Sequence, residues 1–143
     1  MYFNFDASFD LADLTFSYES GLSDGPAAAG GGGNGIFVGQ NVFQADGDGK
    51  YDILFDFPPP PGNQKWMAGE TVVYTITSSS DAITSSSFNF LSAPGGNSAG
   101  PFLSVARFQS TGTGGGGSDW VGTGVVPVPA AVCLCRHWRG GTC

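Results

Sequence analysis

Apolar residues alternate with polar residues in several short runs of this chain. The clearest runs are residues 3–9, 14–18, 51–57 and 71–77, where aromatic or β-branched side chains recur at every second position. Successive side chains of a β-strand point to opposite faces, so this period predicts strands with one buried face. The chain also holds 24 glycines, each of which destabilises a helix by roughly 1 kcal/mol relative to alanine. A helical bundle is therefore excluded.

Further strands are predicted at residues 36–45, 85–91, 102–110 and 119–121, separated by glycine-rich and proline-rich turns. Strands at this spacing predict an all-β chain, an antiparallel β-sandwich of jelly-roll type with seven or eight strands. The side chains expected to face inward are Phe3, Phe5, Phe16, Phe43, Ile53, Phe55, Val72, Tyr74, Ile76, Phe88, Phe90 and Phe108.

Charge divides the chain near residue 132. Residues 1–132 hold all twelve acidic residues and three basic ones, a balance that disfavours nucleic-acid binding. Residues 133–143, CLCRHWRGGTC, hold all three cysteines and the only histidine. The predicted organisation is a β-sandwich domain at 1–121, a linker with a short motif at 122–132, and an aberrant, disordered tail at 133–143.

The inventory of catalytic groups predicts a protein that is not an enzyme. A Ser-His-Asp triad needs a histidine base, and the only histidine is His137 in the aberrant tail. Carboxylate pairs for glycoside hydrolysis are present in number, but no pair is singled out. The glycine runs lack the strand and helix context of phosphate-binding loops and are interpreted as linkers.

One acidic loop is a candidate calcium site. Asp46, Asp48 and Asp52 stand at positions i, i+2 and i+6, with glycines between them, as in D-x-D-G-x-x-D loops of extracellular β modules. Closely spaced carboxylates are the ligands that Ca²⁺ prefers. Phe57 occupies the twelfth position, where an EF-hand needs glutamate, so an EF-hand is rejected. The alternative is a hairpin turn in which Asp-Gly supplies the positive-φ residues.

Exposed aromatic residues of a sandwich could stack on sugar rings. Trp66 and Trp120 are the candidates for such a carbohydrate-binding face. Aromatic residues at alternating strand positions more often form the core, so both interpretations stand at this point.

The segment Val125–Val132, VVPVPAAV, follows a glycine linker and resembles a PEP-CTERM sorting signal of the V-P-x-P-A-A variant. The resemblance implies that Val126, Pro127, Val128, Pro129 and Ala130 form a sorting motif for an exosortase of a Gram-negative bacterium that makes exopolysaccharide. The body is also similar to β-rich proteins that carry this tail, over roughly residues 36–121, in the runs ADGDGKYDILFDFPPPPG, AGETVVYTIT, SFNFLSAPGG and GPFLSVARFQSTG.

The ending departs from that family. The family pattern continues with an apolar membrane helix and a basic cluster, whereas here the apolar run ends at Cys135. Six apolar residues after Pro129 are too few to span a bilayer. We hypothesise that a frameshift replaced the helix after residue 132, and we expect no membrane span in this form.

These features predict a secreted, non-enzymatic protein of the cell surface or extracellular matrix with a structural or adhesive role. The expected partners are an exosortase, by resemblance, and extracellular polysaccharide. No signal peptide is evident in residues 1–20, which fits a truncated start. The alternative is a carbohydrate-binding or carbohydrate-active module, stabilised by Ca²⁺. A third interpretation is a defective gene fragment without function.

Overall fold

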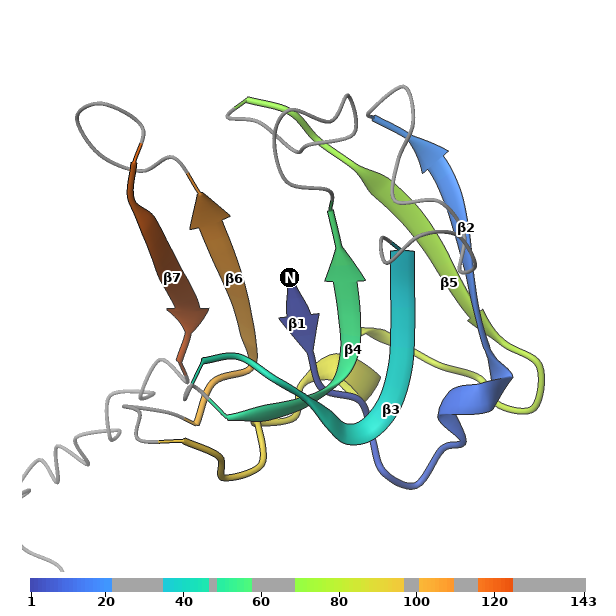
Figure 1. The fold of residues 1–143 in the computed structure, drawn as a ribbon. Helices are drawn as coiled ribbons and strands as arrows, with labels where there is room; N and C mark the ends of the chain where they lie inside the picture. Colours follow the sequence, from blue (N-terminus) through green and yellow to red (C-terminus); the bar gives the residue numbers. More distant parts are fainter. Residues whose placement is uncertain (22–34, 47–48, 58–68, 97–100, 110–115, 125–143) are drawn as a thin grey trace, which may run out of the picture.

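The described part of the chain forms strands and two short 3-10 helices. The computed structural model describes residues 1–21, 35–46, 49–57, 69–96, 101–109 and 116–124 (Figure 1). The elements are β1 (Tyr2–Phe3), η1 (Leu11–Asp13), β2 (Leu14–Ser20), β3 (Gly35–Gln44), β4 (Lys50–Asp56), β5 (Val73–Ser78), η2 (Ser85–Phe88), β6 (Ser104–Gln109) and β7 (Ser118–Thr123).

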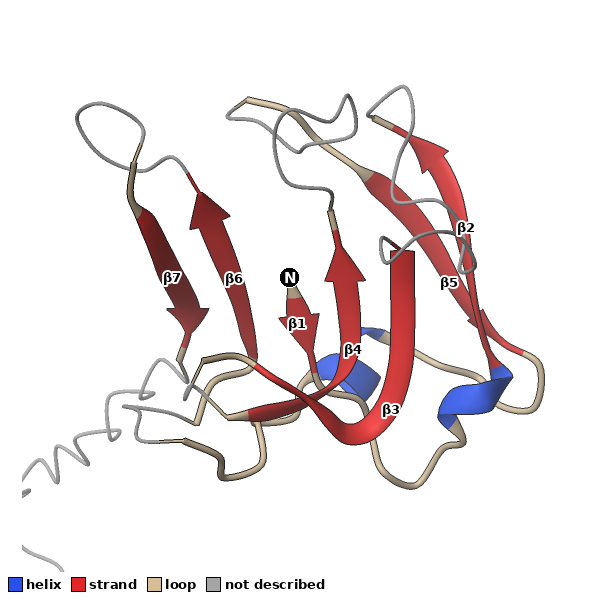
Figure 2. Cartoon of the chain, in the orientation of Figure 1, coloured by secondary structure: helices blue, strands red, loops and turns tan. Residues whose placement is uncertain are grey.

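The strands form two sheets in which every pairing is antiparallel (Figure 2). One sheet has five strands in the order β3-β4-β1-β6-β7, and the other has two, β2 and β5, which we call the ribbon. The two-residue strand β1 lies in the middle of the larger sheet and pairs with β4 on one side and β6 on the other. The predicted all-β class is confirmed.

The main core lies between the ribbon and one half of the larger sheet. Its buried residues are Phe5, Ile36, Ile53 and Phe55. The ring of Phe55 on β4 lies 5.7 Å from the ring of Phe16 on β2 and 5.2 Å from that of Tyr74 on β5, both in edge-on geometry. Burial of a phenylalanine side chain contributes about 2–3 kcal/mol, so these contacts attach the ribbon to the sheet.

A second, smaller cluster lies on the opposite face of the larger sheet. Phe3 is opposite Ile53 in the ladder, on the face that the ribbon covers, which we call the first face. Tyr2 is opposite both Leu54 and Val105, so its side chain points to the other face, which we call the second face. This second cluster contains the buried residues Ala45, Tyr51 and Val105, with Tyr2 and Trp120 packed against them.

The β3–β4 hairpin bends sharply where its ladder is interrupted. Val38 pairs with Ile53 and Phe43 with Tyr51, so five steps along β3 match two along β4. Asn41 lies in this bulge with φ 54°, a left-handed conformation that asparagine tolerates better than most residues. The bend places the far end of the hairpin at the bottom of the larger sheet, away from the ribbon (Figure 1).

Two predicted strands differ from the structure. The strand predicted over residues 3–9 ends at Phe3, because the Phe5 and Asp6 N–H groups donate to the Asp52 carboxylate and the Ser87 carbonyl, outside any ladder. The strand predicted at 85–91 is wrong, because residues 85–88 form η2. There the Thr84 N–H donates to the Ser87 hydroxyl, a local bond that competes with strand pairing.

Most of the predicted inward-facing residues do pack in the core. Phe5, Ile53 and Phe55 are buried, Phe3, Phe16, Tyr74, Ile76 and Phe88 pack around them, and Phe43 and Val72 are half-buried. Phe90 and Phe108 were predicted wrongly, being 39% and 47% exposed. Phe90 follows η2 and lies outside any strand. Phe108 lies on the first face of β6, but the ribbon covers that face at β4, where it packs on Phe55.

Candidate functional site

The second face carries a connected group of aromatic side chains. The ladders place Phe37, Leu54, Tyr2, Val105 and Gly122 in one row across the five strands. Alternation along each strand puts every one of these positions on the same face of the sheet. The row therefore joins residues from both ends of the chain in a single surface.

Trp120 and Tyr2 are the centre of this surface. Trp120 lies two residues before Gly122 on β7 and so shares its face. Its ring centroid is 5.7 Å from that of Tyr2, which in turn lies 5.8 Å from that of Tyr51. Tyr51 is fully buried, whereas Tyr2 and Trp120 are half-buried. The buried ring thus supports two rings that solvent can reach.

Arg107 stands beside Trp120 on the neighbouring strand. The two residues are paired directly in the β6–β7 ladder. The guanidinium carbon lies 5.7 Å from the centre of the indole ring, within the range of a cation–π contact. The Arg107 side chain is exposed, and its Nη2 lies 3.5 Å from the Ser118 hydroxyl.

A glycine on β7 makes room for another aromatic ring. A Cβ atom placed on Gly122 would lie 2.8 Å from Cδ1 of Phe102, closer than carbon atoms approach in proteins. The Phe102 ring therefore lies directly on the backbone of β7, on the second face. Only glycine allows this contact without displacement of the ring.

Charged groups of both signs act on the Tyr2 hydroxyl. Burial raises the pKa of the Tyr2 hydroxyl, the Asp56 carboxylate raises it further, and Arg107 acts in the opposite direction. Burial also raises the pKa of Asp56, while the positive charge of the Met1 α-amino group lowers it. Tyr2 thus lies in the fields of a carboxylate and of a guanidinium.

The α-amino group of Met1 lies at the edge of this site. It donates a hydrogen bond of 2.8 Å to the Phe55 carbonyl, and the Met1 carbonyl accepts one from the Phe55 N–H. Burial lowers the pKa of the amine from 8.0 to about 6, and Asp56 opposes this shift.

The structure places two of the three predicted calcium ligands. Asp52 is buried, and its two oxygens accept hydrogen bonds from the N–H groups of Phe5 and Asn41, at 3.0 Å and 2.7 Å. Asp46 is exposed, with φ 35°, as the turn interpretation expects. Asp48 lies outside the described residues, and the described residues contain no group of three potential metal-ligating side chains. The calcium site stays a prediction.

Several other predicted residues lie outside the described part of the chain. These are Trp66, the sorting motif at 126–130 and the tail at 133–143. In the described ranges, no helix has the length and apolarity that a bilayer crossing requires.

Sequence reasoning missed Tyr2, Arg107 and Phe102 as members of the aromatic surface. Tyr2 has the opposite parity to Phe3 in an alternating run, a signal that it faces away from the main core. Arg107 lies beside Trp120 because β6 pairs with β7, and Tyr2 lies near them because β6 also pairs with β1. Alternation within each strand does not reveal which strands pair.

The comparisons with known proteins add no relative. The chain matches no protein-family model, no curated protein and no solved structure. Its function is therefore argued from its own residues.

Proposed function

We propose that this protein is a secreted, non-enzymatic adhesive protein of the cell surface or extracellular matrix, and that its second face binds polysaccharide. The observation that carries the proposal is the position of Trp120, which is held by Tyr2 and yet remains partly open to solvent. This joins the adhesive role and the carbohydrate-binding alternative in one surface.

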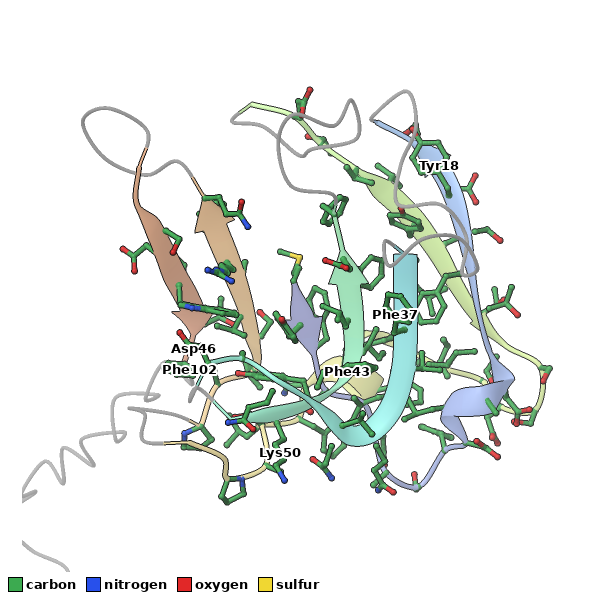
Figure 3. The ribbon with its side chains drawn as sticks, in the orientation of Figure 1. Tyr18, Phe37, Phe43, Asp46, Lys50 and Phe102 are labelled. Carbon is green, nitrogen blue, oxygen red and sulfur yellow. The ribbon has the colours of Figure 1, made fainter. Side chains whose placement is uncertain are left out.

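The chemistry of sugars favours an aromatic surface of this kind. A pyranose has C–H groups on its ring faces and hydroxyl groups around its rim, so a flat aromatic ring can cover the former without desolvating the latter. Aromatic residues also supply large contact areas. Phe37, at 36% exposed, extends the surface along the same row toward β3, the strand on which Figure 3 labels it.

The rigid placement of these side chains supports a binding role. Tyr2, Arg107 and Trp120 come from three neighbouring strands, and ladders join β6 to both of the others. A site built on strands keeps its geometry better than one built on loops, and less conformational entropy is lost when a ligand binds.

The sorting-like motif supports the surface location. Val126–Ala130 resembles the exosortase recognition motif and follows β7, the last described strand, after Gly124 and Val125. In a matrix of exopolysaccharide, a polysaccharide-binding face would attach the domain to its surroundings without catalysis.

The test is binding of soluble oligosaccharides to the full chain, measured by isothermal titration calorimetry. Trp120→Ala is expected to weaken binding about tenfold, or ~1.4 kcal/mol, while Phe108→Ala binds as the wild type does. Phe108 is the matched control, because it is an exposed aromatic residue of the same hairpin on the first face.

Trp120 also packs on buried residues, so Trp120→Phe provides a milder variant if the alanine variant unfolds. Wild-type affinity in a folded Trp120→Ala protein would refute the assignment of the site. A wild-type chain that binds no oligosaccharide, neutral or acidic, would refute the proposed function itself.

A further inference from the structure

We propose that the polysaccharide bound by the second face is acidic, and that Arg107 binds the carboxylate groups of its uronic acid residues. This inference rests on the proposed function and adds the chemical class of the ligand. It is argued from the unused hydrogen-bonding capacity of Arg107, from its placement beside Trp120, and from the charge of the domain.

Arg107 retains most of its hydrogen-bonding capacity. A guanidinium group has five N–H donors. Within the described residues, its polar contact is the Ser118 hydroxyl at 3.5 Å, the outer limit of a hydrogen bond, and no carboxylate forms an ion pair with it. This is unusual in a domain where acidic residues greatly outnumber basic ones. The exposed guanidinium is therefore available to a ligand.

The guanidinium is also positioned for a planar anion. Its rigid fork matches the two oxygens of a carboxylate, and two parallel hydrogen bonds give both strength and orientation. The indole of Trp120 restricts the guanidinium to one region, 5.7 Å from the ring centre. A pyranose in contact with the exposed part of Trp120 would bring its substituents beside this group. Stacking and ion pairing would then engage the same sugar unit.

The charge of the domain favours a polymer with one charge on each sugar unit over a more densely charged polyanion. Residues 1–132 carry twelve acidic and three basic residues, so long-range repulsion opposes any polyanion. A uronic acid places a single carboxylate on each sugar ring, and one contact with Arg107 can offset that repulsion. Densely sulfated or phosphorylated chains would meet repulsion from many more charges.

The experiment compares a charged ligand with an uncharged one that has the same sugar rings. Oligogalacturonate and its fully methyl-esterified form share the same sugar rings, but the ester lacks the negative charge. The full chain is titrated with each ligand by calorimetry. The wild type is expected to bind the acid about tenfold more tightly than the ester.

Arg107→Gln is expected to bind the two forms with equal affinity, because the group that distinguishes the acid from the ester is removed. Arg107→Lys keeps the charge and loses the fork, so a partial preference is expected. Lys50→Gln is the matched control: it removes the other basic residue of the described chain, at the far end of the bent hairpin (Figure 3), and should leave the preference unchanged.

Three results would overturn the inference. Equal affinity of the wild type for acid and ester would refute it and leave the proposed function intact. A preference for the acid that survives in Arg107→Gln would assign the carboxylate to another residue. Absence of binding to both forms and to neutral oligosaccharides would refute the proposed function as well.

Discussion

The backbone N–H of Asn41 donates a hydrogen bond of 2.7 Å to Oδ1 of Asp52, at the point where β3 leaves its ladder with β4. The other oxygen of Asp52 accepts from the Phe5 N–H at 3.0 Å. One buried carboxylate thus replaces the ladder partners of two backbone groups. It connects the bend of the hairpin to the segment that follows β1.

Asp52→Ala should destabilise the protein by about 2–4 kcal/mol, because two backbone N–H groups would lose their acceptor. The free energy of unfolding is measured by urea titration. Glu19→Gln, a substitution of an exposed acidic residue on β2, should change stability by less than about 0.5 kcal/mol. An equally small effect of Asp52→Ala would show that water can replace the carboxylate.

The calcium prediction has a distinct signature. A site made by Asp46, Asp48 and Asp52 would raise the melting temperature at millimolar Ca²⁺. Asp46→Asn should abolish that rise while the stability without calcium stays the same, because Asp46 is exposed. A hairpin turn alone predicts no calcium-dependent shift in either protein.

Gly122→Ala should destabilise the protein by about 1–3 kcal/mol, because the new methyl group would overlap the Phe102 ring. Gly124→Ala is the matched control, since its methyl group would meet no atom within 4 Å. A double-mutant cycle with Phe102→Ala measures the coupling. If the two substitutions are strictly additive in chemical denaturation, the contact does not account for the effect.

The buried amine of Met1 predicts that stability increases between pH 6 and pH 8. Its pKa is about 6 in the folded chain and 8.0 in the unfolded chain, so the unfolded state binds more protons in this interval. Stability is lost as pH falls from 8 to 6, by roughly 2–3 kcal/mol. His137→Gln provides the background for urea titrations at each pH, because it removes the only histidine of the sequence. A flat profile would contradict the burial of the amine.

Tyr74 predicts a loss of stability in alkali. Burial, with a smaller contribution from Tyr18, raises the pKa of its hydroxyl to about 12. Because the folded state holds this proton more tightly than the unfolded state does, stability falls as pH rises from 10 toward 12. Ultraviolet titration should show one phenolate step near pH 12 that is absent in Tyr74→Phe. If the step persists in the variant, it belongs to another tyrosine.

The sequence predicts strands well where alternation and local turns act together. Residues 50–56 form β4, close to the predicted range 51–57, because aromatic alternation and the preceding Asp-Gly turn signal agree there. Residues 88–90 alternate as well, but in the residues before them the Ser87 hydroxyl accepts a hydrogen bond from the Thr84 N–H, within a 3-10 turn. The composition of the site could not be predicted without the pairing of distant strands. Trp120 was a candidate from its residue type, whereas Tyr2 and Arg107 become its neighbours only because β6 pairs with both β1 and β7.

The central position of β1 has a consequence for folding. Its two residues join the β3–β4 hairpin to the β6–β7 hairpin, and Tyr2 pairs with Val105, about a hundred residues further along the chain, so the contact order is high and folding is expected to be slow. Residues 2–3 are synthesised long before residues 104–105, so the larger sheet cannot close until β6 is available. Until then, the edge of β1 that pairs with β6 stays open to other chains. The shortest strand of the larger sheet thus determines when its two hairpins can join.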